Sequence, residues 1–432
     1  MTKATFDRCL FSLIILLGPF SITQWNKPFL VLILILSCML LASMSMSDRG
    51  LSLHKTEVMV VGLYLTILAI GFVTLLISHM NPYGMLIDSN TLGRVFTVSV
   101  LSTMLVSGLS YMNSLDDIKF RALKNLFIIP GLIFALFGIY QTYCNYIGIS
   151  FVIETRDWMH GVPANIRDVF PKRITSIAEE PSFLAPILVE FLILCFFLIE
   201  RKWLKYSLLA MTLVLLLMTF SGGAYVNISL ILFIAIVILL WKFPFGRLHL
   251  GVLVLVIACS SFLVIYGETL IDYVFTKLTH EASGGSSRGQ FTSNLIGLFV
   301  SADTFSLMFG HGLTSLTYLS DFGMKTEDVI FRISNNMFID IGWESGLIGV
   351  LLTIAMYGVL FTNGMKIQIG KSASLSLSLL LVFQLLITSL YRSEYISTHF
   401  IWMLILIFWV LRYEKLSLPI DMNHLNSKKG YE

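Results

Sequence analysis

Long apolar segments alternate with short polar loops along most of the chain. A helix needs about 20 apolar residues to cross a membrane, because every backbone polar group must be satisfied inside the segment. The pattern predicts about twelve such spans, so we expect an all-α, polytopic membrane protein built as a single integral membrane domain over residues 1–432. The spans are expected near 9–24, 28–45, 57–78, 94–113, 125–148, 182–200, 204–221, 224–241, 249–267, 337–361, 374–391 and 398–412.

Two long polar loops interrupt this pattern, at residues 149–181 and 268–336. The second loop contains two short segments with apolar residues at helical spacing, 268–280 and 293–300, which predict amphipathic helices at the membrane surface. An enzyme that acts on a lipid-linked substrate needs a loop of this kind, because its chemistry takes place where water and lipid meet. A transporter does not need one.

The composition strengthens the membrane prediction. Hydrophobic residues make up 56% of the chain and charged residues 13%, whereas a soluble domain keeps about a quarter of its residues charged. The five cysteines fall in or at the ends of apolar segments, without metal-ligand spacing or a readable disulfide framework. We expect no metal, no cofactor and no nucleic-acid partner.

The distribution of Lys and Arg predicts an orientation. With the N-terminus inside, 11 of the 29 basic residues lie on the outer side and 18 on the inner side, as cytoplasmic loops prefer. Both termini are therefore expected in the cytoplasm and both long loops outside. The first apolar segment lacks a small-residue cleavage site and is predicted to be a signal anchor. The chain shows no internal repeat, which disfavours the common transporter folds.

Two arginines on different outer loops, Arg173 and Arg288, are candidate ligands for a pyrophosphate. A guanidinium is always charged and offers a planar fork that matches phosphate oxygens. The alternative is that they are ordinary loop arginines paired with Glu179 and Glu180.

Glu180 and His311 are candidate proton acceptors. The pKa of a carboxylate near lipid and beside a second carboxylate rises toward a useful range, and histidine titrates near neutral pH. The alternatives are that Glu180 complements the dipole of a helix starting at Pro181, and that His311 is a polar loop residue.

Three polar residues, Asn336, Asp340 and Glu344, are spaced to share one stripe of a helix, which predicts a cavity lining, although Glu344 could be structural. Gly342, Gly346 and Gly349 predict a face for close helix packing. Glu190 lies in the middle of an apolar segment. We expect it to be protonated and hydrogen-bonded, the alternative being a place in a groove.

Five segments together resemble the O-antigen ligase/polymerase superfamily, which comprises multi-span bacterial glycosyltransferases with a GT-C-like architecture. The resemblance covers about residues 170–350, and the first five spans agree only in character. The segments are RITSIAEEPSFLAP at 173–186, TFSGGAYVN at 219–227, SSRGQF at 286–291, FGHGL at 309–313 and NNMFIDIGWESGLIG at 335–349.

The resemblance implies that Arg173 and Arg288 bind the undecaprenyl pyrophosphate of a donor. Ligases of this superfamily commonly have His-Asn before the helix that ends in E-x-G-L-I-G, and this chain has Asn335 and Asn336 there, so a polymerase is favoured. Both asparagines are candidate substrate-binding residues. The acceptor base is expected among Glu180, His311 and Asp340, in that order of preference.

The implied function is polymerisation of undecaprenyl-pyrophosphate-linked oligosaccharide units into a surface polysaccharide (O-antigen, capsule or exopolysaccharide). The reaction would take place at the periplasmic face of the bacterial inner membrane, and a polysaccharide chain-length regulator is a candidate partner. The alternatives are a ligase that transfers finished glycan to lipid A core, a lipid-linked oligosaccharide flippase, and a non-catalytic scaffold.

Overall fold

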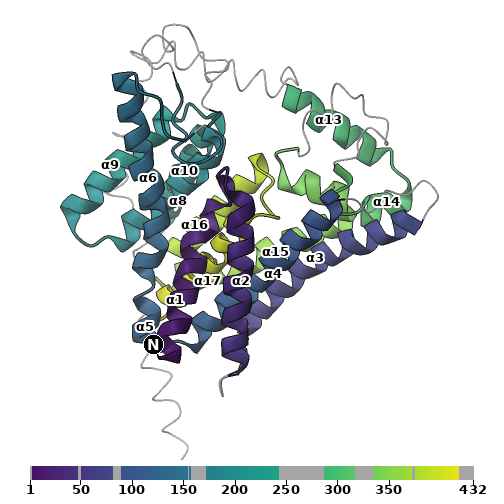
Figure 1. Cartoon of the computed structure of the whole chain (residues 1–432), viewed down its shortest axis with the longest axis horizontal. Coiled ribbons are helices and arrows are strands. Elements are labelled where there is room, and N and C mark those ends of the chain that lie inside the picture. Colours follow the sequence, from purple (N-terminus) through teal and green to yellow (C-terminus); the bar gives the residue numbers. More distant parts are fainter. Residues whose placement is uncertain are drawn as a thin grey trace, which may run out of the picture.

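The computed structural model describes residues 2–46, 50–80, 89–153, 155–156, 172–242, 287–316, 334–371 and 375–417, which form helices and contain no strand (Figure 1). The first half contains α1 (Lys3–Leu17), the 3-10 helix η1 (Gly18–Ile22), α2 (Asn26–Ser45), α3 (Lys55–Met80), α4 (Ser89–Ser114), α5 (Asp117–Arg121) and α6 (Lys124–Ile147). The second half contains α8 (Pro181–Leu198), α9 (Lys202–Met218), α10 (Gly222–Lys242), α13 (Ser287–Val300), α14 (Thr304–Phe309), α15 (Met337–Gly370), α16 (Leu377–Tyr391) and α17 (Thr398–Lys415).

The multi-pass membrane fold is confirmed. Eight helical segments among the described residues are long and apolar enough to cross a membrane, and α16 is a shorter apolar helix. Every predicted span except 249–267 coincides with a helix, and that span lies outside the described residues, as does the predicted amphipathic segment 268–280. The total of twelve spans therefore stays a prediction. The second amphipathic segment forms the end of α13.

Helix α17 forms the centre of the bundle. Every residue from Thr398 to Leu411 is buried, because η1, α4, α15 and α16 pack around the helix. A helix that is apolar on all sides is stable only when it is enclosed in this way. Near the C-terminal end of α17, the indole Nε1 of Trp409 donates to the carbonyl oxygen of Phe120 at 3.1 Å.

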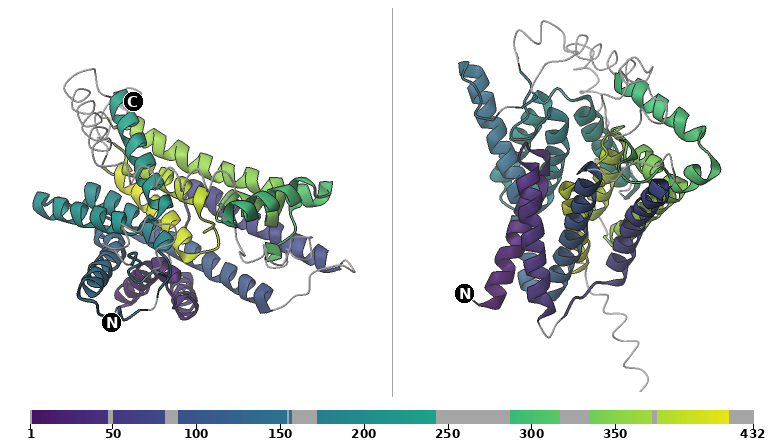
Figure 2. Two further views of the ribbon diagram at one scale, coloured as in Figure 1. Left: turned by 90° about the horizontal axis from the view of Figure 1, so that it is seen from above. Right: turned by 45° about the vertical axis from the view of Figure 1, so that its right-hand side comes forward.

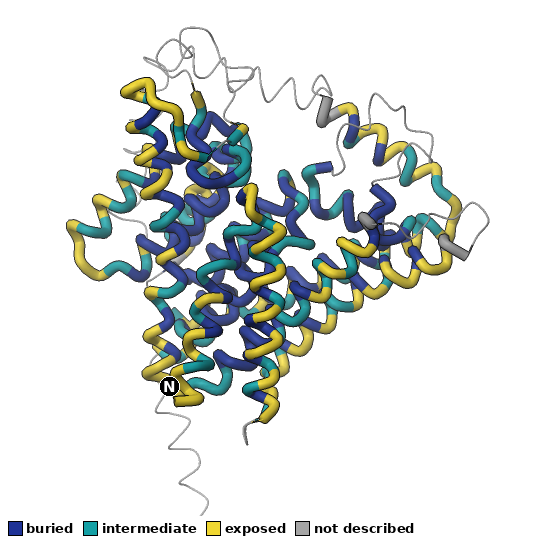
Figure 3. Tube along the Cα trace, in the orientation of Figure 1, coloured by how far each residue is buried: buried dark blue, intermediate teal, exposed yellow. Residues whose placement is uncertain are grey.

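The peripheral helices expose apolar side chains on their outward faces. Figure 3 shows exposed positions along the outside and buried positions in the centre. Val73 and Ile77 of α3 and Phe233 of α10 are among the exposed large side chains. Apolar outward faces on long helices are what a lipid environment requires.

The long helices run between two ends of the bundle (Figures 1 and 2). Ion pairs tie helices together at the end that holds the N-terminus: Lys124 with Glu200 at 2.8 Å and Lys371 with Glu414 at 2.6 Å. The opposite end holds α13 and the described parts of the two long polar loops. The prediction that the two loops share one end is confirmed for those parts, whereas the side of the membrane that this end faces stays a prediction.

Candidate functional site

The link between α16 and α17, residues 392–397, joins three parts of the molecule at the end opposite the N-terminus. We call it the bridging segment. It is held at both ends by the helices themselves: the amide of Arg392 donates to the carbonyl oxygen of Thr388 at 2.8 Å, and the Ser397 hydroxyl accepts from the amide of Phe400 at 3.1 Å. The direction of its side chains is therefore well defined.

On one side the bridging segment contacts the start of α8. The guanidinium of Arg392 lies over the Phe183 ring, 4.1 Å from its centroid, and donates to the carbonyl oxygen of Ser182 at 3.4 Å. Arg392 also forms an ion pair with Glu394, and both side chains are buried. A stacked, paired guanidinium can be buried because its charge is compensated.

A chain of buried groups continues from Glu394 into the bundle. Glu394 Oε2 is hydrogen-bonded to His399 Nδ1 at 2.6 Å, and His399 Nε2 to Glu190 Oε2 at 2.9 Å. Burial alone would raise the pKa of Glu394, but the charges of Arg392 and His399 lower it to about 2. The predicted hydrogen bonding of Glu190 is confirmed, and its partner is His399.

On the other side the bridging segment contacts α15. The Tyr395 hydroxyl donates to Glu344 Oε2, and the carbonyl oxygen of Tyr395 accepts from the Tyr64 hydroxyl at 2.8 Å. Glu344 Oε1 also accepts from the amide of Thr314 at 3.0 Å and from Arg94 Nη2 at 3.4 Å. Four segments of the chain therefore meet at one carboxylate.

This arrangement corrects the predicted cavity-lining stripe. Asp340 is 0% exposed and Glu344 is 1% exposed. Asp340 Oδ1 accepts from the amide of Ser334 at 2.9 Å, and Ser393 of the bridging segment is a further partner. The burial and the partners of Glu344 favour the alternative interpretation, in which it is structural. A buried carboxylate is stable only when groups such as these compensate it.

The FGHGL segment fits into a break of α15. Gly346 has φ +70° and ψ −172°, so the helix is interrupted there. The amides of His311 and Gly312 donate to the carbonyl oxygens of Trp343 and Glu344, at 2.8 and 3.0 Å, groups that a break would otherwise leave unsatisfied. Gly346 nevertheless packs closely on a helix, as the glycine face predicts, because its nearest neighbours, Met308 and Phe309, are the last residues of α14.

The fit of this turn depends on glycine at two facing positions. A Cβ on Gly310, at φ +82°, would lie 2.5 Å from the Glu344 carbonyl carbon. A Cβ on Gly346 would lie 2.2 Å from the carbonyl oxygen of Met308. Neither backbone position has room for a larger residue, and both lie in the conformation that glycine adopts most easily. We call the turn and the break together the 310/346 joint.

Helix α13 adds an apolar contact to this region. Phe291 and Leu295 are buried against Leu316 and Trp343 in a small cluster separate from the main core. The helix therefore packs one apolar face on α15, as its amphipathic pattern predicts. Arg288 lies in the first turn of α13, and its side chain is outside the described residues.

Arg173 lies against the turn between α9 and α10. Its Nε donates to the carbonyl oxygen of Thr219 at 2.8 Å, and its Nη2 to that of Phe220 at 3.0 Å. The carboxylates of Glu179 and Glu180 are paired with a different arginine, Arg156, at 3.3 and 2.9 Å. A pyrophosphate clamp of Arg173 with Arg288 therefore stays a prediction.

The other candidates are placed as follows. Asn336 caps α15: its Oδ1 accepts from the amides of Phe338 and Ile339 at 3.0 and 3.3 Å. Asn335 precedes it with φ +60°. The His311 ring lies beside the indole of Trp343, 4.2 Å between centroids, and burial lowers its pKa. His311 is therefore neutral at pH 7, which is the form that accepts a proton.

The sequence did not predict a functional role for the bridging segment. Its partner Arg94 and the residues Arg392, Glu394, Tyr395 and His399 are not among the candidates predicted from the sequence. The available signal was a polar run, Arg392 to His399, between two apolar helices. Its partners are 209 and 51 positions away in the sequence, for His399–Glu190 and Tyr395–Glu344, so spacing could not identify them.

The site as a whole consists of buried hydrogen bonds and ion pairs that connect α8, α15 and α17 through the bridging segment. Among the described residues, no group of three or more His, Cys, Asp or Glu side chains could hold a metal ion. Comparison of the chain with models of known protein families and with curated proteins finds no match.

Proposed function

We propose that this chain is a glycosyltransferase that polymerises polyprenyl-pyrophosphate-linked oligosaccharide units into a surface polysaccharide. The observation that carries the proposal is that the five segments on which the family resemblance rests pack in two groups, which the bridging segment joins. Arg173 of the first bonds to Thr219 and Phe220 of the second. Phe291 of the third packs on Trp343 of the fifth, and the fourth fills the break of the fifth.

The bridging segment connects these two groups of segments. It contacts the first group through Arg392 on Phe183, and the second through Tyr395 on Glu344. If the five segments resembled the family only by chance, their assembly at one end of the bundle would not be expected. Their contact at one end of a membrane bundle supports a common site that faces a lipid-linked substrate.

In the proposed reaction, an acceptor hydroxyl attacks the anomeric carbon of the sugar on a second carrier. The bond from that carbon to the pyrophosphate oxygen breaks, the polyprenyl pyrophosphate leaves with the bonding electrons, and the hydroxyl proton passes to a base. Because the donor is already activated, the protein has to position both partners and stabilise the departing charge. Arg173 and Arg288 are the proposed ligands of that charge.

The geometry keeps Asp340 last among the candidate bases, as the order expected from the sequence has it. His311 is neutral at pH 7 and only half-buried, and Glu180 is partly exposed beside Arg156. Asp340 is fully buried and held by Ser334, which makes it the weakest of the three candidates. We therefore place His311 and Glu180 ahead of Asp340.

The test is complementation of a deletion strain, with the length distribution of the surface glycan as the readout. Arg288→Ala is expected to reduce long-chain polymer on the order of 100-fold, because one donor to the leaving group is lost. Arg201→Ala, an exposed arginine at the opposite end, is the matched control and should restore normal chain length. Membrane levels of each variant are measured alongside.

The deletion itself separates the rival functions. Loss of a polymerase leaves core capped by a single unit, loss of a ligase leaves polymer on the carrier lipid, and loss of a flippase exports no glycan. Normal long-chain polymer from Arg288→Ala would remove the central part of the proposal. Full-length polymer retained on carrier lipid in the deletion strain would replace it by the ligase.

A further inference from the structure

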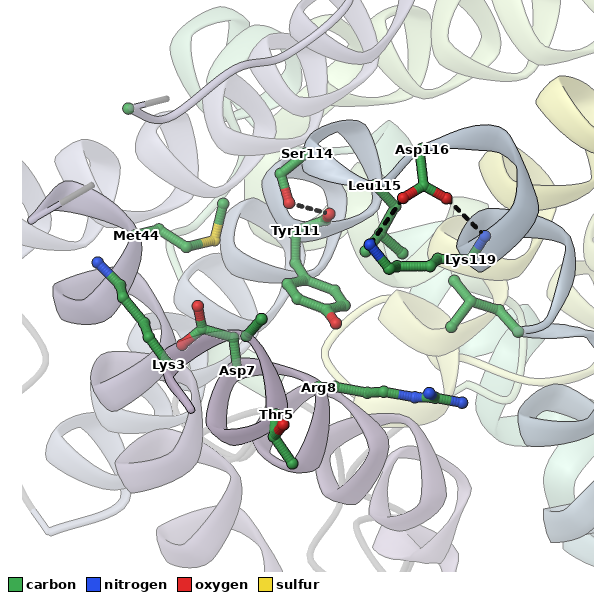
Figure 4. A pocket seen from close by; sticks show the side chains of 13 residues that line it. Lys3, Thr5, Asp7, Arg8, Met44, Tyr111, Ser114, Leu115, Asp116 and Lys119 are labelled. Carbon is green, nitrogen blue, oxygen red and sulfur yellow. Dashed lines mark hydrogen bonds and ion pairs between the residues drawn. The ribbon is translucent and has the colours of Figure 1, made fainter. Parts of the chain in front are cut away.

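A cavity of about 480 Å³ opens at the end of the bundle that holds the N-terminus, away from all the residues discussed so far (Figure 4). Its volume lies within the roughly 300–1,000 Å³ of small-molecule sites. The walls come from α1, the end of α2, the end of α4 and the start of α5. The side chains that the argument uses are Lys3, Asp7, Arg8, Tyr111, Asp116 and Lys119.

The cavity has a surplus of positive charge. Its two carboxylates already have partners: Asp7 accepts from the Ser43 hydroxyl at 2.6 Å, and Asp116 pairs with Lys119 at 2.7 Å. Lys3 and Arg8 form no ion pair with any other part of the chain that the structure describes. The lining holds three cations, Lys3, Arg8 and Lys119, against these two carboxylates, so it carries one net positive charge.

A tyrosine side chain also lines this space. Tyr111 is 5% exposed, and its ring packs on Phe11 with 4.6 Å between centroids. Its phenol oxygen makes no hydrogen bond within the described ranges, and Figure 4 shows it directed toward Arg8. The phenol is therefore available to donate to an acceptor oxygen of a ligand in the cavity.

The position of the cavity specifies the surroundings of that ligand. Lys3 begins the first candidate membrane span, Met44 lies next to the end of the second, and Ser114 ends the fourth. The cavity therefore lies at the depth where lipid headgroups meet water. Basic side chains at this depth attract anionic lipids.

We propose that this cavity binds the phosphate of an anionic phospholipid headgroup, held by Arg8 and Lys3 and by a hydrogen bond from Tyr111. Guanidinium and ammonium groups supply charge-assisted bonds to phosphate oxygens, and the phenol adds a neutral donor. The exposed apolar face of α2, which includes Ile35 and Met39, offers a surface for the acyl chains. The proposal is independent of the glycosyltransferase function.

The test uses the full-length protein in nanodiscs that contain phosphatidylcholine and phosphatidylglycerol in equal amounts. After detergent extraction, native mass spectrometry counts the lipids that stay bound. Wild type is expected to retain one phosphatidylglycerol in preference to phosphatidylcholine. Arg8→Ala should lower that occupancy about tenfold and Tyr111→Phe a few-fold, whereas Arg201→Ala, an exposed arginine outside the cavity, should leave it unchanged.

The source of the phosphate is tested in the same assay with inorganic phosphate as competitor. Retention of phosphatidylglycerol in millimolar phosphate supports the lipid. Displacement by phosphate, with no preference between the two lipids, would assign the cavity to a soluble phosphate compound and overturn the lipid proposal. Equal retention of phosphatidylglycerol by wild type, Arg8→Ala and Tyr111→Phe would overturn the site. If Arg8→Ala folds poorly, the comparison of wild type with Tyr111→Phe still tests it.

Discussion

At the scale of single residues, Glu344 carries more contacts than its position in an apolar helix suggests. It accepts from Arg94, from Tyr395 and from the amide of Thr314. The Glu344→Gln substitution would remove the charge that compensates Arg94. Because Arg94 is partly exposed, we expect the free energy of unfolding to fall by about 2 kcal/mol, below the full cost of a broken buried pair.

Thermal unfolding in detergent measures this effect. The control is Asp116→Asn, whose ion pair with Lys119 is exposed and should change stability by no more than about 0.5 kcal/mol. If both variants unfold at the same temperature, Glu344 does not hold the four segments together.

The burial of His311 predicts that the stability of the protein depends on pH. Burial lowers its pKa in the folded protein below the ordinary value near 6.5. As the pH falls, the unfolded chain therefore binds a proton at this histidine at a higher pH than the folded protein does. The stability that neutral His311 contributes is present above about pH 6.5 and is lost as the pH falls below that value. Unfolding temperatures of wild type and His311→Gln between pH 7.5 and 5.5 test this. The wild type should lose more stability on acidification, and parallel curves would contradict the assignment.

At the scale of elements, the 310/346 joint makes α15 a helix of two halves. Gly346→Ala would place a Cβ at φ +70° against the carbonyl oxygen of Met308, and we expect it to destabilise the protein by about 3 kcal/mol or more. Gly358, in the same helix, has open space around it. Gly358→Ala is the matched control and should stabilise by about 0.5–1 kcal/mol. Equal effects of the two substitutions on the unfolding temperature would show that the joint is not strained by a side chain.

The helices themselves could be predicted from the sequence, because an apolar run of about 20 residues leaves the backbone no alternative in lipid. The start of α8 at Pro181 and the amphipathic α13 follow from local signals. The joint could not be predicted. A glycine in an apolar helix is compatible with close packing and with a break of the helix. Whether α15 breaks at Gly346 depends on hydrogen bonds from a distant turn that includes Gly312, 34 positions earlier.

The candidate site was predictable only in part, for the same reason. Residues on one helix share a stripe by geometry, so Asp340 and Glu344 could be grouped from their spacing. Whether the stripe faces open space depends on what covers it. Tyr395 and Arg94 cover Glu344, and they come from distant helices. A charged partner on another span cannot be predicted from the spacing of residues within one helix.

At the scale of the whole molecule, the two ends of the bundle predict an experiment on topology. Val152 and Ile118 are strongly exposed and lie at opposite ends. In a cysteine-free background, Val152→Cys should react with a membrane-impermeant thiol reagent in intact cells, and Ile118→Cys only after permeabilisation. The reverse labelling pattern would invert the predicted orientation and move the proposed site to the cytoplasm.

The 310/346 joint also limits how this protein can be recombined with others. The turn at 310–313 bonds to two carbonyl groups of α15 and, through the amide of Leu313, to the carbonyl oxygen of Gly71 in α3 at 2.9 Å. A chimera that exchanges only residues 287–316 would pair a foreign turn with a native break. We expect functional chimeras to have their crossover points outside all three pieces, so that α3, the turn and α15 are inherited as one unit.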